Sequence, residues 1–135
     1  MSKPSRQAAF PLLAAGILGL TGVALGAMGA HAMKATLAER GMMQAWETAA
    51  RYHLFHAVGL IGIAAWLRAA NGDGGWGKLI WAARLWVIGT VLFSGSLYWL
   101  AIGGPRWLGP ITPLGGVAFM IGWLLVALTA LARRA

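Results

Sequence analysis

Residues Gln7 to Met33 read QAAFPLLAAGILGLTGVALGAMGAHAM, a run of 27 residues without Asp, Glu, Lys or Arg. At about 1.5 Å per helical residue, this run is long enough to cross a hydrocarbon core about 30 Å thick. It therefore predicts a membrane-spanning helix, which we place at about 8–30. Lys3 and Arg6 also make the basic start of a signal peptide, but the apolar stretch exceeds the roughly 7–15 residues of such peptides.

The composition of the whole chain agrees with a membrane location. Of its 135 residues, 59% are hydrophobic and 10% are charged, whereas soluble domains carry about 25% charged residues. The chain contains no cysteine, which excludes disulfides, thiolate metal sites and cysteine nucleophiles. The 20 glycines stand within apolar runs and predict closely packed helices. We expect one integral membrane domain covering residues 1–135.

Three further spans are predicted downstream. The uncharged run 52–67 has 16 residues, roughly 24 Å as a helix, so this helix has to begin earlier, near residue 45. The spans are placed at 45–68, 82–103 and 111–132. Thr36 and Glu39 have the spacing of a capping box, which predicts a short interfacial helix ending at Gly41. The expected fold is an all-α four-transmembrane-helix bundle.

The distribution of cations predicts the orientation of this bundle. The net charge is +8, and because the cations flank apolar segments we expect them to meet anionic lipid headgroups and not nucleic acid. Seven fall on one side of the predicted membrane: Lys3, Arg6, Arg68, Lys78, Arg84, Arg133 and Arg134. Four fall on the other: Lys34, Arg40, Arg51 and Arg106. The positive-inside rule then places both termini in the cytoplasm. Interfacial belts are predicted for Trp46, Trp99 and Trp107 outside and for Trp66, Trp76 and Trp81 inside.

Small residues mark the predicted helix contacts. Gly22 and Gly26 have GxxxG spacing, and Ala30 continues the same ridge, so that a neighbouring helix can lie directly on it. Gly115 and Gly116 clear space near the start of the last helix. These glycines favour packing within the chain, with a homo-oligomer contact or a membrane-protein partner as the alternative.

Polar side chains gather toward the predicted outer ends of the helices. Glu47 and Arg51 stand at i, i+4 in the order that favours an ion pair, and Tyr52 and His56 share a face. By helix rise, His56 and Ser94 are expected in one layer, roughly 10–15 Å below the outer surface, between the second and third helices. The candidate residues of this polar layer are His31, Glu47, Arg51, Tyr52, His56, Ser94, Ser96, Tyr98 and Thr112.

These residues leave several functions open. Serines in such helices commonly bond helix backbone, and His56 fits a structural link across an interface as well as a ligand site. A metal site built from His31, His53 and His56 is an alternative, although two of these share one helix. The chain shows no nucleophile–base–acid set, and it predicts no cofactor. We therefore expect a structural or accessory membrane component. The alternatives are binding or permeation of a lipid, quinone or small solute at His56, and a metal-dependent enzyme.

Four stretches in order carry a family resemblance over nearly the whole chain. They are Gly26-Ala27-Met28-Gly29-Ala30-His31, Glu47-Thr48-Ala49-Ala50-Arg51-Tyr52 with His56-Ala57, Phe93-Ser94-Gly95-Ser96-Leu97-Tyr98, and Thr112-Pro113-Leu114-Gly115-Gly116 with Gly122-Trp123. The chain resembles the bacterial family called domain of unknown function 423, which includes the eukaryotic transmembrane protein 256. The resemblance implies a small multi-span inner-membrane protein without established catalytic residues. Met28 departs from a common phenylalanine. His53 departs from a frequent glutamine, which weakens a metal site at that position.

Overall fold

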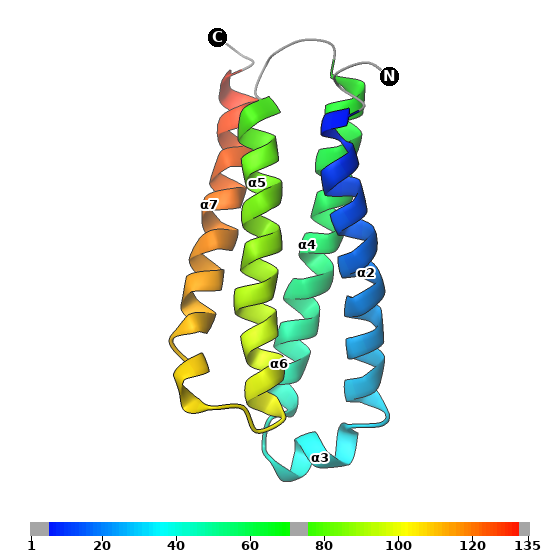
Figure 1. The fold of residues 1–135 in the computed structure, drawn as a ribbon, viewed down its shortest axis with the longest axis vertical. Coiled ribbons are helices and arrows are strands. Elements are labelled where there is room, and N and C mark those ends of the chain that lie inside the picture. Colours follow the sequence, from blue (N-terminus) through cyan, green and yellow to red (C-terminus); the bar gives the residue numbers. More distant parts are fainter. Residues whose placement is uncertain (1–5, 71–75, 133–135) are drawn as a thin grey trace.

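The computed structural model describes residues 6–70 and 76–132, and in these residues it contains helices and no strand. Four long helical segments run side by side, antiparallel to their sequence neighbours (Figure 1). In chain order the elements are α2 (Ala9–Ala30), α3 (Lys34–Glu39), α4 (Met43–Ala69), α5 (Trp76–Gly89), the π-helix η1 (Thr90–Gly95), α6 (Ser96–Ala101), the 3-10 helix η2 (Arg106–Leu108) and α7 (Ile111–Ala132). Lys3, Arg133 and Arg134 of the predicted cation pattern lie outside the described residues.

The long helices form two closely packed pairs, α2 with α4 and α5 with α7 (Figure 1). On α2 the buried face passes through Ala15, Gly22 and Gly29, which are spaced by seven residues. A seven-residue step returns to within about 20° of the same direction on a straight helix. The contact face of α2 therefore follows a heptad spacing, as in helices that cross at a shallow angle.

Trp86 of α5 joins the two pairs. Its side chain is 1% exposed. The six-membered ring lies against the site where Gly59 of α4 lacks a Cβ, and the Nε1 edge lies against the equivalent site of Gly122 on α7. A Cβ at Gly59 would be 2.7 Å from Trp86 Cζ3. The two glycines thus provide the space that lets one large ring occupy the centre of the bundle.

The predicted helix positions agree with the structure within a few residues, apart from the third helix. That helix was placed at 82–103, but α5 begins at Trp76, and a π-helical segment precedes α6. The predicted short helix is present as α3. It begins at Lys34, so Thr36 lies inside the helix, and no side-chain cap bond is formed at its start. Trp46, predicted for an interfacial belt, is instead 3% exposed.

The end of the bundle opposite the chain termini is closed by two turns of the same kind. Gly41 and Gly103 have φ angles of +64° and +103° and end α3 and α6. In each turn the N–H of the glycine and the N–H of the following residue donate to carbonyl groups of the preceding helix, as in a Schellman motif. An example is Gly104 N to Trp99 O at 2.8 Å. Arg40 Nε donates to the carbonyl of Ala101 at 3.0 Å, which links the two turns. A cation is also favoured at this carboxyl end of α6.

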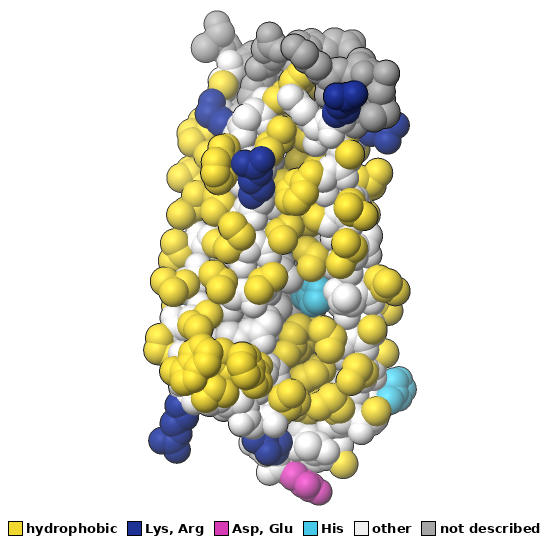
Figure 2. Space-filling view, viewed as in Figure 1, with side chains coloured by type: hydrophobic (Ala, Val, Ile, Leu, Met, Phe, Trp, Pro, Cys, Tyr) yellow, Lys and Arg dark blue, Asp and Glu magenta, His cyan; other side chains and the backbone are white. Residues whose placement is uncertain are grey.

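The exterior between the two ends is apolar. Figure 2 shows a broad band of hydrophobic side chains with Lys and Arg at both ends of the long axis. Three helical segments are long and apolar enough to cross a membrane: Ala9–Ala30, Trp76–Ala101 and Arg106–Ala132. The helix α4 is equally long, but Arg51, His53 and His56 lower its mean hydropathy. Between Arg51 and Arg68 its outward side chains are nevertheless largely apolar, with Phe55 and Val58 61% and 67% exposed.

Candidate functional site

His53 is the centre of a hydrogen-bonded chain that joins three helices. Its Nε2 lies 3.2 Å from Thr21 Oγ1 on α2, and its Nδ1 lies 3.1 Å from the Tyr98 hydroxyl on α6. The Thr21 hydroxyl already donates to the carbonyl of Ile17 at 2.8 Å, so it accepts from His53 Nε2–H. Tyr98 consequently donates its proton to Nδ1. The bonding partners thus define a neutral histidine with its proton on Nε2.

His56 has the opposite tautomer and different partners. Its Nδ1 lies 2.7 Å from the carbonyl of Tyr52 and donates to it, while its Nε2 accepts from Trp123 Nε1 on α7 at 3.1 Å. The imidazole stacks on Phe119 with ring centroids 3.7 Å apart and an interplanar angle of 6°. The side chain is 3% exposed. Both ring nitrogens are therefore occupied by protein groups.

The two histidines face different neighbours because three helical residues turn the side chain by about 300°. His53 points toward α2 and α6, and His56 toward α5 and α7. From the sequence we expected one polar layer between the second and third helices. In the structure the two histidines of α4 belong to two clusters, one that joins α4 to α2 and α6 and one that joins α4 to α5 and α7. The first and last helices thus contribute side chains directly to them.

The predicted hydroxyl groups lie at helix contacts. Ser94 is 0% exposed and donates to the carbonyl of Ala49 on α4 at 2.8 Å. Ser96 donates to the carbonyl of Phe93 at 2.9 Å, so the 2.6 Å contact with Thr112 on α7 has the threonine as donor. Ser94 belongs to the π-helix η1, whose wider turn changes the direction in which later side chains point.

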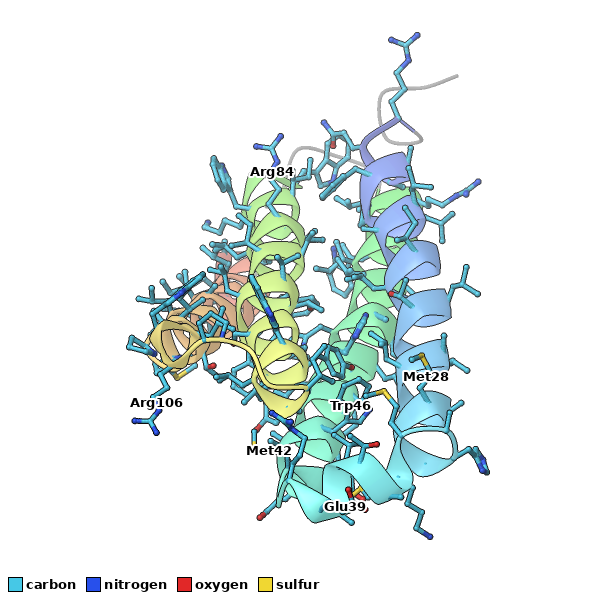
Figure 3. The ribbon with its side chains drawn as sticks, turned by 60° about the horizontal axis from the view of Figure 1, so that its bottom comes forward. Met28, Glu39, Met42, Trp46, Arg84 and Arg106 are labelled. Carbon is cyan, nitrogen blue, oxygen red and sulfur yellow. The ribbon has the colours of Figure 1, made fainter. Side chains whose placement is uncertain are left out.

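Trp46 extends the His53 cluster toward the closed end of the bundle. Its Nε1 donates to the carbonyl of Leu25 on α2 at 2.8 Å. Its ring occupies the space next to Gly29 and meets Tyr98 edge to face, with centroids 4.7 Å apart. Figure 3 shows Trp46 between α4 and α2. The contact explains why this tryptophan is inside the protein, since its N–H finds a backbone partner there.

Three of the predicted polar residues do not join these clusters. Glu47 and Arg51 are both exposed, and the structure forms no ion pair between them. His31 is exposed at the end of α2 and makes no side-chain hydrogen bond to a described residue. The fourth residue, Tyr52, is 40% exposed, and its ring centroid lies 4.9 Å from that of Phe93. Within residues 6–70 and 76–132, no three His, Asp or Glu side chains gather closely enough to hold a metal ion.

Replacing Arg51 with alanine is expected to change the free energy of unfolding by no more than about 0.5 kcal/mol, because the side chain is exposed and unpaired with Glu47. Arg40→Ala is the matched comparison, since it removes a charged donor from the Ala101 carbonyl and should cost about 1 kcal/mol or more. Unfolding by denaturant in detergent micelles measures both. Equal losses in the two variants would contradict the assignment of Arg40 as the structural cation.

The structure separates the predicted packing residues into close and open positions. A Cβ at Gly22 would lie 2.8 Å from Leu54 Cδ2, and one at Gly115 would meet the backbone of Phe93. A Cβ at Gly26 would have no neighbour within 4 Å, and Ala30 is exposed. Four-residue steps drift by about 40° each on a helix, so the Gly22–Gly26–Ala30 ridge turns away from α4. Gly116 is a looser contact, 3.9 Å from Phe93 Cδ2.

Two hydrogen-bonding partners of the histidines, Thr21 and Trp123, were not singled out as site residues from the sequence. Thr21 is the lone hydroxyl within α2, and a hydroxyl inside a spanning helix needs a partner. Trp123 lies in the middle of a span and away from the membrane interface, so its N–H also requires an acceptor. Both signals were present in the sequence. The partner of each could not be read from it.

An all-helical protein with an apolar exterior, whose inward polar side chains bond one another, is an integral membrane protein. The comparisons with known proteins agree. The chain belongs to the family described as protein of unknown function (DUF423), whose model matches residues 25–116. The resemblance stated above is therefore confirmed, and so is a bacterial inner-membrane location.

Several curated relatives cover most of the chain. The UPF0382 membrane protein YwdK of Bacillus subtilis is 43% identical over 111 residues, which are 82% of this chain and 87% of the relative. A UPF0382 membrane protein of Staphylococcus epidermidis is 41% identical over 81% of this chain and 84% of its own. The UPF0382 inner membrane protein YgdD of Escherichia coli is 39% identical over 90% of this chain and 89% of its own. No solved structure matches the chain.

Proposed function

We propose that this chain is a structural or accessory membrane component, a single domain of four transmembrane helices with both termini in the cytoplasm. The supporting observation is that its inward polar groups are used for bonds between helices. His53, His56, Ser94 and Ser96 each contact another helix through a hydrogen bond. Such bonds fix the register of the helices and leave both buried imidazoles without a free nitrogen.

The helix α4 is the fourth span in this proposal, although its mean hydropathy is lower than that of the other three. His53 and His56 are buried at 4% and 3% exposure. The two histidines, which lower the hydropathy of α4, therefore face protein, and the outward face of its middle part meets lipid through Phe55, Val58 and Ile61. A buried, bonded histidine costs far less in a membrane than one facing hydrocarbon.

The orientation follows from the cation count of the sequence, seven on the side where α2 begins and four on the other. The described cations are four at each end, Arg6, Arg68, Lys78 and Arg84 against Lys34, Arg40, Arg51 and Arg106, so the excess comes from Lys3, Arg133 and Arg134, which lie outside the described residues. Because the chain contains no cysteine, single-cysteine labelling tests this directly. Lys34→Cys should react with a membrane-impermeant maleimide in intact spheroplasts, and Lys78→Cys only after lysis. The reverse pattern, or equal labelling of both before lysis, contradicts the orientation.

A structural component acts through assembly, so its oligomeric state tests the proposal. Extraction in native lipid discs followed by native mass spectrometry should give a defined assembly, either several copies of the chain or a complex of fixed stoichiometry. A monomer without partners under these conditions contradicts it. The alternative of a ligand at His56 is less supported, because a ligand would have to displace the indole N–H of Trp123.

A further inference from the structure

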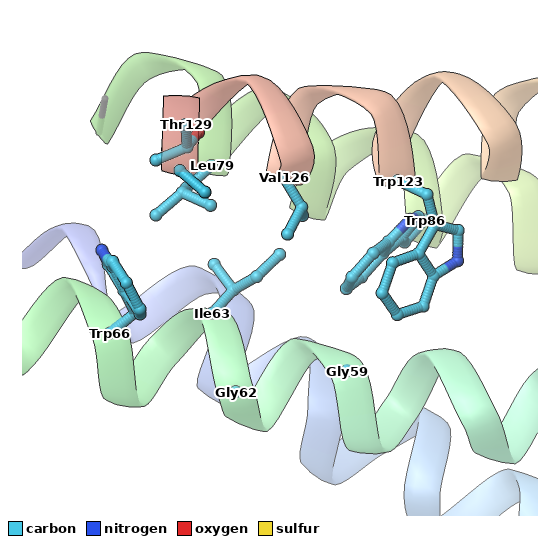
Figure 4. A pocket seen from close by; sticks show the side chains of 10 residues that line it. Gly59, Gly62, Ile63, Trp66, Leu79, Trp86, Trp123, Val126 and Thr129 are labelled. Atoms are coloured by element: carbon cyan, nitrogen blue, oxygen red, sulfur yellow. The ribbon is translucent and has the colours of Figure 1, made fainter. Parts of the chain in front are cut away.

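Between the two helix pairs the bundle has an open apolar groove with a volume of about 370 Å³. Figure 4 shows Ile63 and Trp66 of α4 on one side, and side chains of α5 and α7 on the other. The lining residues are Gly59, Gly62, Ile63, Trp66, Leu79, Trp86, Trp123, Val126, Thr129 and Ala130. Trp66 and Trp123 are 44% and 49% exposed. The groove therefore opens to the exterior of the bundle.

Glycines on α4 keep this groove open. The ring of Trp86 fills the space beside Gly59, but a Cβ added at Gly62 would have no heavy atom within 4 Å. The groove follows α4 from Gly59 to Trp66, a rise of about 10 Å. Its long direction is therefore that of the helices, which is also the direction of acyl chains in a bilayer. Near one end, Trp123 donates its N–H to His56 and closes the groove toward the polar cluster.

Water is a poor occupant of such a groove. One water molecule occupies about 30 Å³ in the liquid, and a buried water needs two to four polar partners. The lining offers one hydroxyl, Thr129, whose proton is donated to the carbonyl of Leu125 at 2.9 Å. Among the lining indoles, Trp123 donates its N–H to His56, and the N–H of Trp86 is buried without a partner among the described residues. A single donor is fewer than the two to four partners that a buried water needs. The occupant is therefore apolar.

Two cations lie near the level of the other end of the groove along the helix axes. Arg68 follows Trp66 by two residues, a rise of about 3 Å, and leaves α4 on another face than Trp66. Lys78 directly precedes Leu79, which lines the groove. Both cations are exposed. No acidic residue is found on the described parts of α5 and α7 or on α4 beyond Glu47. Asp73, which stands between these two cations in the sequence, lies outside the described residues. An apolar slot whose end lies near exposed cations matches a molecule with an apolar chain and an anionic head.

We propose that this groove binds one acyl chain of an anionic phospholipid, whose phosphate lies at the end of the bundle that carries Arg68 and Lys78. The inference goes beyond the proposed structural role and does not depend on the orientation in the membrane. The bound lipid would fill the space between the helix pairs and contact both of them. It is a lipid site of the chain itself, separate from the predicted site at His56.

Native mass spectrometry of the delipidated protein in detergent, titrated with dioleoyl phosphatidylglycerol or dioleoyl phosphatidylethanolamine, tests this site. We expect one phosphatidylglycerol to bind at least fivefold more tightly than phosphatidylethanolamine, since each basic residue near a headgroup contributes about fivefold. Arg68→Gln with Lys78→Gln should reduce this preference to about one. Retention of the preference in that double variant overturns the assignment of the headgroup.

Gly62→Trp tests the acyl-chain slot, because the added ring fills open space without displacing a described atom at its Cβ. It should weaken binding of both lipids at least tenfold. Gly19→Trp is the matched control, since a Cβ there also has no neighbour within 4 Å and the residue is outside the groove. Circular dichroism and gel filtration verify folding, and Gly62→Leu replaces Gly62→Trp if the latter is unfolded. Unchanged lipid binding in the folded groove variant overturns the proposal. So does a groove variant that binds lipid normally but no longer forms a dimer, because the groove would then be a contact between two copies of the chain.

Discussion

Gly115→Ala is expected to destabilise the protein by about 1–3 kcal/mol, the usual cost of adding a methyl group to a filled interior. The Cβ would overlap the backbone N of Phe93 and lie 2.8 Å from its Cα. Backbone atoms of η1 cannot move aside as a side-chain tip can, so α7 and the π-helix would have to separate. The separation would also strain the bond between Thr112 of α7 and Ser96, the first residue of α6, which directly follows the π-helix.

Gly116→Ala is the control for this prediction. Its Cβ would be 3.9 Å from Phe93 Cδ2, an ordinary contact. Both substitutions give the same intrinsic helix gain, about 1 kcal/mol for alanine over glycine, so the difference between them isolates the packing term. Thermal unfolding in detergent, followed by circular dichroism, should show Gly115→Ala well below wild type and Gly116→Ala at or above it. Equal midpoints in the two variants would show that α7 does not pack on η1 as closely as the structure has it.

His53→Leu is expected to lose about 2–3 kcal/mol, because it removes one acceptor and one donor and leaves Tyr98 and Thr21 without their partner. Hydrogen bonds between membrane helices average about 0.6 kcal/mol and reach about 1.7. The larger part of the loss therefore comes from the Tyr98 hydroxyl left buried without an acceptor. Denaturant unfolding in detergent measures this loss.

His53→Gln distinguishes a bonding role from a protonation or metal-binding role. A glutamine amide accepts from Tyr98 through its oxygen and donates to Thr21 through its nitrogen, so most of the stability should return. In the His53→Leu background, Tyr98→Phe should cause little further loss, since the hydroxyl has already lost its acceptor. If glutamine were as destabilising as leucine, the proposed proton arrangement of the cluster would be wrong.

The polar residues were found from the sequence more readily than their partners. Ser94, Ser96, Tyr98 and His56 were all predicted, because polar groups are rare in apolar helices and therefore easy to see. The expected ion pair of Glu47 and Arg51 is not formed, since i, i+4 spacing permits a contact in an exposed region but does not require one. The π-helix also has no simple sequence signal, and it decides where Ser94 points.

The glycines likewise were found from the sequence, but the helix that each of them contacts was not. The GxxxG pattern at Gly22 and Gly26 suggested one ridge, yet the contact face runs through Gly22 and Gly29. Spacing alone gives the set of residues that share a side of the helix. The crossing angle of the partner decides which of them it touches, and that angle depends on side chains such as Trp46 that belong to another helix.

The amino-acid sequence by itself determined that this protein is an all-helical membrane protein, because an apolar run of 27 residues with so few charges elsewhere has no other stable environment. It also determined approximately where the long helices begin and end. The tertiary structure alone decided that His53 and His56 belong to separate clusters and that a groove lies between the helix pairs. These features depend on helix rotation and distance, which are set by packing between residues far apart in the chain and not by local spacing.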